Sequence, residues 1–183
     1  MIEAAAALLA WLGAALVVLA DARRGLAFGL ALVTIGFAVL AWETGQPIGA
    51  FALAAGGATG AFRCWTAGPA TWGLMAAGST PRLVLCIAAG LLALWVSASV
   101  TTEPGAPLRF AVLVVIGLMA ARVLARGQAD VDRAAIACLA LALASSPALA
   151  SSVSNGPVPY IIGALIAAAV MVPGTRPRGA SGG

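Results

Sequence analysis

The hydrophobic residues of this chain fall into long runs that are separated by short polar turns. Most of these runs approach the roughly 20 residues that a helix needs to cross the hydrocarbon core of a bilayer. About seven runs can be followed, over residues 4–20, 25–42, 48–62, 83–100, 110–124, 134–150 and 157–172. The runs are continuous rather than alternating, which favours helices over strands. The pattern therefore predicts an all-α protein, a polytopic bundle of about seven transmembrane helices.

The composition supports this class of protein. Hydrophobic residues make up 62% of the 183 residues, charged residues only 9%, and the mean hydropathy is +1.06. A soluble domain of this length needs a polar shell that so few polar residues cannot form. The net charge of +4 would suggest nucleic acid in a soluble protein. Here the basic residues lie at the ends of apolar runs, where they set topology and meet lipid headgroups. We therefore expect the lipid bilayer, and no nucleic acid, as a partner.

The arginines predict how the chain crosses the membrane. Short loops rich in Arg stay in the cytoplasm. All ten basic residues are arginine. If the N-terminus is outside and the chain crosses seven times, every arginine except Arg109 falls inside. The expected arrangement is therefore an outside N-terminus and an inside C-terminus in the inner (cytoplasmic) membrane of a bacterium.

The chain is expected to form one domain. Residues 1–173 would be the transmembrane part, and residues 174–183 a disordered cytoplasmic tail. The arginine-rich turns at 21–24 and 126–133 resemble each other, and a further run follows the second helix of each hairpin. This similarity suggests two three-helix units joined by the fourth run, although helices rich in Ala and Leu also resemble one another by composition alone.

Residues 64–81 are the ambiguous part of the pattern. Pro69 and three glycines interrupt an apolar stretch between Arg63 and Arg82. If the stretch crossed the membrane, these arginines would lie on opposite sides, so we expect an interfacial or re-entrant segment on the inner side. Aromatic side chains gather at the level of the headgroups. The expected interface anchors are Trp42, Trp65, Trp72 and Tyr160.

Ionisable residues all lie at or beyond the ends of the runs. Proteins that carry ions or protons usually place a charged partner inside the membrane despite its cost. The polar groups within the runs are hydroxyls and thiols, which commonly bond a backbone carbonyl one turn back. Only Thr34, within a run, and Glu43, the carboxylate closest to a helix core, are weak candidates for an ion path.

No catalytic or metal chemistry is expected. The chain has no histidine, which excludes a Ser–His pair. Its cysteines, Cys64, Cys86 and Cys138, lack the spacing of a zinc site. The turn 126–133 could bind a phosphate group, but a solvated turn explains it better. We therefore expect no enzyme activity in the chain itself, no cofactor and no metal.

Pairs of glycines suggest close packing between helices. Gly25 and Gly29 form one GxxxG pair, and Gly56 and Gly60 form another. Such pairs let helix backbones approach each other in lipid. The expected role is a non-catalytic integral membrane subunit that packs these faces against other subunits of a larger complex. The alternative is a small-solute membrane transporter, or its membrane binding component, with its site in residues 48–81. A third interpretation is a lipid-active membrane enzyme.

The stretch Val115–Leu143 resembles a known helix–arginine turn–helix unit. It carries the run Ile116-Gly117-Leu118, a basic turn at Arg122 and Arg126, and an apolar helix after the turn. This unit is similar to the core of the K-type small subunit of respiratory complex I and to part of component E of group-4 membrane hydrogenases. The resemblance implies membership of a complex of that kind. The complex I subunit carries membrane-embedded glutamates that are missing here, so the resemblance leaves a scaffold role rather than a proton relay.

Overall fold

The computed structural model describes residues 1–20, 22–66, 80–100, 105–124, 129–149 and 156–172, without the side chains of residues 97–100. In these ranges the chain forms seven α-helices and one short 3-10 helix. They are α1 (Ile2–Leu19), α2 (Arg23–Glu43), α3 (Pro47–Thr66), α4 (Thr80–Val100), α5 (Ala106–Leu124), α6 (Ala129–Ser145), η1 (Ser146–Leu149) and α7 (Val158–Val170). The all-helical fold predicted from the hydrophobic pattern is confirmed.

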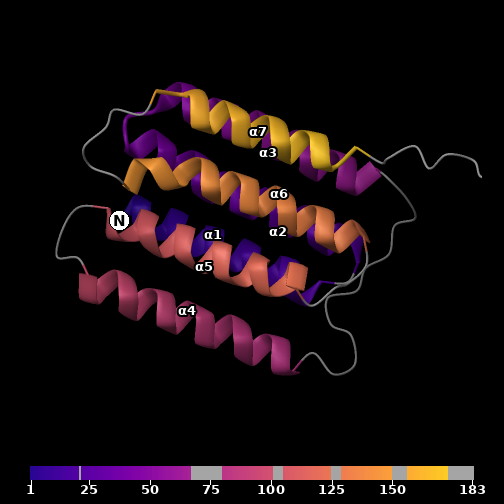
Figure 1. The fold of residues 1–183 in the computed structure, drawn as a ribbon, viewed down its shortest axis with the longest axis horizontal. Helices are drawn as coiled ribbons and strands as arrows, with labels where there is room; N and C mark the ends of the chain where they lie inside the picture. Colours follow the sequence, from indigo (N-terminus) through magenta and orange to yellow (C-terminus); the bar gives the residue numbers. More distant parts are fainter. Residues whose placement is uncertain (21, 67–79, 101–104, 125–128, 150–155, 173–183) are drawn as a thin grey trace, which may run out of the picture.

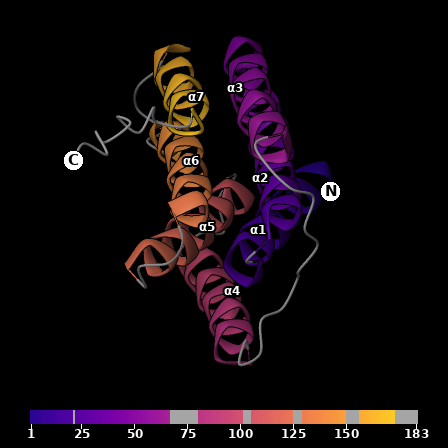
Figure 2. The ribbon, with the colours of Figure 1, turned by 90° about the vertical axis from the view of Figure 1, so that its right-hand side faces the viewer.

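The helices form two facing layers (Figures 1 and 2). One layer contains α1, α2 and α3, and the other contains α5, α6 and α7. Across the layers α1 packs against α5, α2 against α6 and α3 against α7. The remaining helix, α4, lies at the edge and contacts α5 and α1. In the sequence α4 thus follows the three helices of one layer and precedes the three of the other. Two three-helix units and an internal repeat of the sequence stay a prediction.

Facing helices run in the same direction. Gly49, near the start of α3, lies against Tyr160 near the start of α7, and Gly60 farther along α3 lies near Met171 at the end of α7. In Figure 1 α1 and α5 also run in parallel, as do α2 and α6. If a twofold axis parallel to the helices related the two layers, α1 would lie opposite α7. Because α1 instead packs against α5, the second layer is better described as the first layer shifted sideways than as the first layer rotated.

Glycines allow the helix backbones to approach closely. A Cβ atom added at Gly13 of α1 would lie 2.6 Å from the Gly29 carbonyl oxygen of α2. One added at Gly56 of α3 would lie 2.5 Å from the Ala164 carbonyl oxygen of α7. These distances leave no room for any side chain. In lipid, where burial of apolar surface gives little driving force between helices, such contacts supply the packing energy.

The predicted glycine pairs therefore pack within the chain. Gly25, Gly29, Gly56 and Gly60 are all buried. Gly29 lies against α1, Gly56 lies against α7, and Gly60 lies between α2 and α7. This placement differs from the expectation that these faces meet partner subunits. A GxxxG pair indicates a close helix contact, but it does not indicate whether the second helix belongs to the same chain.

Several helix ends differ from the predicted runs. The third run was expected to end near residue 62, but α3 continues to Thr66. The sixth was expected to begin at Ala134, whereas α6 begins at Ala129 and includes two aspartates in its first turn. Pro147 falls in η1, directly after the α-helix ends, in agreement with the break expected of a proline. Both α3 and α6 thus extend past their apolar runs into the neighbouring polar residues.

Four helical stretches are long and apolar enough to cross a membrane by length and composition. They are Ile2–Leu19, Arg23–Glu43, Ala106–Leu124 and Ala129–Leu149. Val158–Val170 is apolar but shorter, and α4 is apolar over Thr80–Val96, the part whose side chains are described. With 20 residues α3 is long enough, but its composition, rich in Gly and Ala, does not qualify. The chain is thus a helical, multi-pass integral membrane protein. Seven crossings stay a prediction.

The segment expected to be interfacial covers residues 64–81. Most of it, residues 67–79, lies outside the described residues. Figure 1 shows that α4 begins at the end of the bundle where α3 finishes. The two helices are therefore antiparallel, as the predicted threading requires.

We expect Gly56→Ala to destabilise the fold by about 1–3 kcal/mol, because the new methyl group meets the backbone of α7. The matched control is Gly117→Ala, where an added Cβ meets nothing within 4 Å. That change should be neutral or stabilise α5 by up to about 1 kcal/mol, the difference in helix propensity. Thermal unfolding in mild detergent, followed by circular dichroism, measures both. Equal melting temperatures for the two variants would contradict the packing described here.

Candidate functional site

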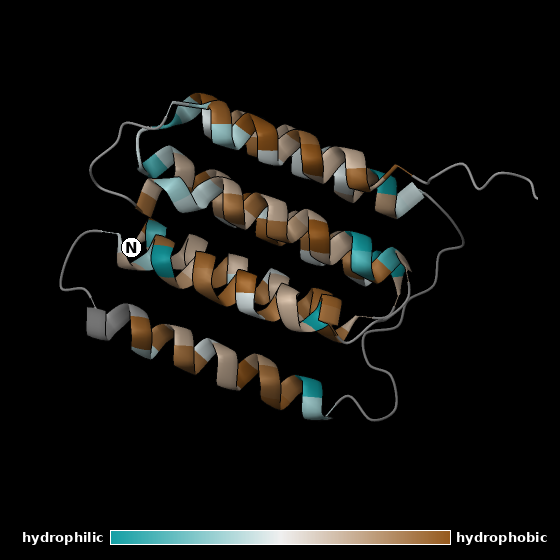
Figure 3. Cartoon of the chain, viewed as in Figure 1, coloured by the Kyte–Doolittle hydropathy of each residue, from teal (hydrophilic) through white to brown (hydrophobic). Residues whose placement is uncertain are grey.

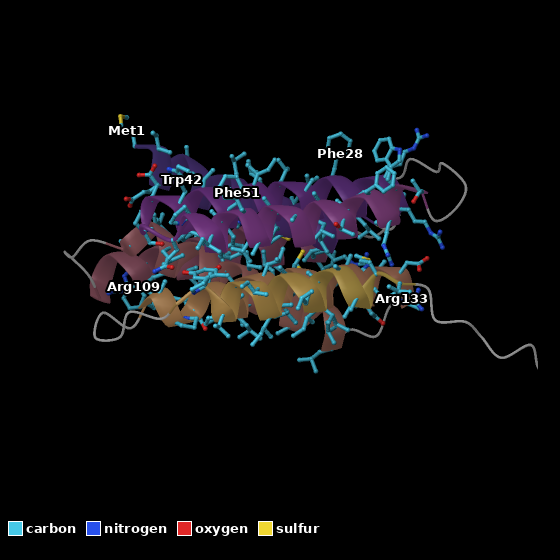
Figure 4. All side chains as sticks on the ribbon, turned by 90° about the horizontal axis from the view of Figure 1, so that it is seen from above. Met1, Phe28, Trp42, Phe51, Arg109 and Arg133 are labelled. Carbon is cyan, nitrogen blue, oxygen red and sulfur yellow. The ribbon has the colours of Figure 1, made fainter. Side chains whose placement is uncertain are left out.

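Polar residues gather at the two ends of the bundle, and apolar residues lie between them (Figure 3). We call one end the arginine-rich end; it is defined by Arg23, Arg24, Arg63, Arg82, Arg122 and Arg133. The other is the Glu43 end, defined by Glu3, Glu43 and Arg109. Figure 4 shows Met1, Trp42 and Arg109 toward one end and Arg133 toward the other. Among the described residues, the lone arginine of the Glu43 end is the one that the predicted threading places outside.

An ion pair joins the two layers at the arginine-rich end. The guanidinium of Arg23, at the start of α2, donates to Oδ2 of Asp130 in α6 through Nη2 at 2.6 Å and Nε at 3.0 Å. Nη1 of Arg133 approaches Oδ1 of the same carboxylate at 3.4 Å. Asp130 lies in the first turn of α6, and its carboxylate links the two arginine-rich turns at 21–24 and 126–133.

Trp65 lies at the same end of the bundle, one residue before α3 ends. The guanidinium of Arg24 lies 5.2 Å from the centre of the Trp65 ring, in cation–π contact. The ring also meets Phe28 edge to face, with centroids 5.9 Å apart. Its side chain is 44% exposed. An exposed tryptophan next to arginines has the environment expected of an interface anchor.

The other expected anchors differ from one another. Trp42 is 56% exposed at the Glu43 end and packs edge to face on Phe51. Tyr160 is only 3% exposed and lies over Gly49 of α3, so its ring fills the contact between α3 and α7 rather than facing headgroups. Trp72 lies outside the described residues.

The weak ion-path candidate Thr34 is used in packing. Its hydroxyl donates to the carbonyl oxygen of Leu30 at 2.7 Å, one turn back. The side chain fills the space over Gly57, where a Cβ atom would overlap it. Ser145 of α6, also buried, bonds the carbonyl oxygen of Leu141 in the same way at 3.0 Å. These hydroxyls are satisfied locally, as expected for polar side chains in apolar helices.

Glu43, the second candidate, borders a hollow at its own end of the bundle. The hollow has a volume of about 250 Å³, and its polar wall comes from Glu3 of α1, Glu43 and Thr44 at the end of α2, and Arg109 of α5. Leucines at positions 40, 108 and 149 form part of its apolar wall. Three separate segments thus bring charges of both signs to one place.

Arg109 is the unusual member of this group. Its Nη1 atom is buried and makes no hydrogen bond. Within the described part of the chain, the ion pairs involve Asp130 and not Glu3 or Glu43. A buried donor without an acceptor costs about 1–3 kcal/mol, and more when it is charged. The Arg109 guanidinium therefore has a buried donor that lacks an acceptor within the described part of the hollow.

A second, apolar groove borders the same helix ends. It has a volume of about 420 Å³ between α1, α4 and α5, and Trp11, Leu91 and Phe110 help to line it. The indole nitrogen of Trp11 donates to the Cys86 carbonyl oxygen of α4 at 3.4 Å. Gly90 of α4 gives this ring its space, because a Cβ atom there would lie 2.8 Å from the indole nitrogen.

The sequence pattern places the charged residues at helix ends, but it does not indicate that Glu3, Glu43 and Arg109 border one hollow. These residues lie far apart in the chain, and only the packing of α1, α2 and α5 joins them. The one signal in the sequence was Arg109 itself, the only arginine assigned to the outer side.

The chain matches no protein-family model, no curated protein and no solved structure. The resemblance of Val115–Leu143 to a complex I or hydrogenase subunit therefore stays a prediction.

We expect Arg23 and Asp130 to stabilise each other by about 0.5–1 kcal/mol, because both side chains are about one-third exposed and water screens the pair. A double-mutant cycle with Arg23→Gln and Asp130→Asn, followed by thermal unfolding in detergent, measures the coupling. High salt should reduce it. Coupling indistinguishable from zero at low salt would show that the ion pair does not hold α2 against α6.

Proposed function

We propose that the chain is a non-catalytic subunit of a larger membrane protein complex, and that it packs against its partner through the outer face of α3. The observation that supports this proposal is the small size of the side chains in the middle of that face, between Phe51 and Phe62. A membrane helix that meets only lipid has no need of small outward residues, whereas a helix that meets another helix does.

The outer face of α3 combines small and aromatic residues. Ala55, Ala58 and Thr59 are exposed, and Phe51 and Phe62 are exposed toward either end of the same helix. The Thr59 hydroxyl bonds the Ala55 carbonyl oxygen at 2.7 Å, which keeps it from standing free in lipid. Ala55 and Thr59 are four residues apart, the spacing of a small-xxx-small contact. Because the opposite face of α3 already packs on α2 and α7, the helix has small residues on both sides.

Other outward faces suit lipid better. Large apolar side chains project from α4, among them Leu91, Leu92 and Trp95, which are each more than 60% exposed. Leu165 of α7 is 64% exposed, and Ile162 beside it is also exposed. The composition of α3 also fails the requirement for a lone membrane span, as described above. Partner contact through α3 accounts for both properties of this helix.

The transporter alternative gains no support from the cavities of the described residues. The groove between α1, α4 and α5 is lined by apolar side chains, and the Trp11 indole N–H already donates to the Cys86 carbonyl oxygen. The mixed-charge hollow lies at the end of the bundle, at the level of Glu3 and Glu43, and not at mid-depth. A lipid-active enzyme likewise lacks a supporting observation.

Replacing Ala55 and Thr59 together by Leu should release the chain from its complex, because the larger side chains hold the partner helix away from α3. Both positions face outward, so the fold should persist. Purification from native membranes in mild detergent, followed by mass measurement of the intact assembly, reads out the result.

The matched control is Ala88→Leu, at an exposed position of α4. It adds the same kind of side chain to a face that we assign to lipid, and the assembly should stay intact. A folded Ala55→Leu, Thr59→Leu protein that keeps its full assembly mass would sink the proposal. The same holds for a wild-type chain that purifies alone from its native membrane.

The orientation of the chain is part of the same proposal. We propose that the arginine-rich end faces the cytoplasm and the Glu43 end faces outward. Its support is the gathering of Arg23, Arg24, Arg63, Arg82 and Arg133 at one end of the bundle, because positively charged short loops are retained inside.

Cysteine labelling tests this orientation. Thr44→Cys at the Glu43 end should react with a membrane-impermeant maleimide in intact cells. Thr80→Cys, at the start of α4, should react only after the membrane is permeabilised. The native cysteines are buried and give a low background. The reverse labelling pattern would place the arginines outside.

A further inference from the structure

We propose that the hollow at the Glu43 end, together with the apolar groove beside it, binds a phospholipid whose zwitterionic headgroup carries a phosphate and a primary ammonium group. The ligand class is phosphoethanolamine. This inference concerns a different region from the outer face of α3 and does not depend on the partner proposed above.

The charges of the hollow are complementary to such a headgroup. Arg109 offers a buried Nη1 donor that no described acceptor satisfies. A phosphate oxygen is a strong acceptor for a guanidinium. Glu3 and Glu43, on the same hollow, offer acceptors to an ammonium group. A single anion would leave the two carboxylates facing it, and a single cation would leave Arg109 unsatisfied, so a ligand with both charges fits best.

The depth of the hollow matches the layer that headgroups occupy. Its charged residues lie at helix ends, outside the apolar middle of the bundle (Figure 3). Trp42 projects at the same end, and exposed tryptophans mark the boundary between headgroups and hydrocarbon (Figure 4). A volume of about 250 Å³ leaves room for a small polar group rather than for a whole lipid.

The groove supplies a place for an acyl chain. It starts at Ala4, the residue after Glu3, and at Pro107, two residues before Arg109. From there it follows α1 and α4 past Trp11 and Leu94. The first turns of α1 and α5 therefore lie between the hollow and the groove. A lipid can place its headgroup on one side of these turns and one chain on the other.

Native mass spectrometry of the purified full chain tests the proposal by titration with three dioleoyl lipids. Phosphatidylethanolamine should bind at least about tenfold more tightly than phosphatidylcholine, whose methylated amine cannot donate hydrogen bonds, or phosphatidylglycerol, which has no cation. Arg109→Gln should weaken the phosphatidylethanolamine complex about ten- to a hundredfold, the effect of losing a charged hydrogen bond. Arg82→Gln, which removes the same charge at the other end, should leave it unchanged.

Glu43→Gln is the second variant. Its side chain is exposed at the end of α2, so the change leaves the packing intact. It should also weaken phosphatidylethanolamine and bring its affinity closer to that of phosphatidylcholine. Equal binding of the three lipids by the wild-type chain would overturn the proposal. So would a preference that survives both Arg109→Gln and Glu43→Gln.

A last arm separates a lipid from a soluble zwitterion. Ala4→Phe fills the mouth of the groove and should weaken the lipid complex, whereas Ala88→Phe, an exposed change on α4 that does not line the groove, should not. Free phosphoethanolamine should compete only weakly. If it displaces the lipid completely at equal concentration and Ala4→Phe has no effect, the ligand is a soluble zwitterion and the lipid proposal is wrong.

Discussion

The close approach of helix backbones is the constraint on which this structure depends. In a bilayer the lipid chains are as apolar as the helices, so helices gain little from burying apolar side chains against one another. They gain from dense contact, and the backbones of α1 and α2, and of α3 and α7, come close enough to exclude any side chain at Gly13 and Gly56. The contact between α1 and α2 holds one layer together, and the contact between α3 and α7 joins the two layers. The Arg23–Asp130 pair then joins the layers at one end.

The sequence predicted the helices well and their contacts poorly, for a physical reason. Long apolar runs and arginines at their ends depend on the bilayer, which acts on each helix separately. Which face of a helix meets which neighbour depends on the fit between two surfaces. The glycines of α2 and α3 were therefore identified as packing positions but assigned to the wrong neighbours. Tyr160 was taken for an interface anchor, although the space over Gly49 encloses its ring.

The candidate site residues were likewise found from the sequence, whereas their neighbours were not. Thr34 and Glu43 were singled out because each was a polar group near an apolar run. In the structure the Thr34 hydroxyl bonds the Leu30 carbonyl oxygen, and Glu43 lines the same hollow as Arg109. No sequence pattern links residues 3, 43 and 109, so the mixed-charge hollow could only emerge from the fold. The sequence also did not indicate a partner contact on the outer face of α3. Its alanines suggest such a contact only once the glycine face of the helix is known to pack on α2 and α7.

The distance between α3 and α7 at their two ends tests the central claim, that glycine contacts hold the two layers side by side and in parallel. Spin labels at Ile48 and Val158, both exposed and next to the Gly49–Tyr160 contact, should give a short distance in lipid nanodiscs by pulsed electron resonance. Labels at Ile48 and Val172 should lie farther apart by about 20 Å, the rise of roughly 14 helical residues. The opposite order of the two distances would show that α7 runs antiparallel to α3 and would contradict the fold.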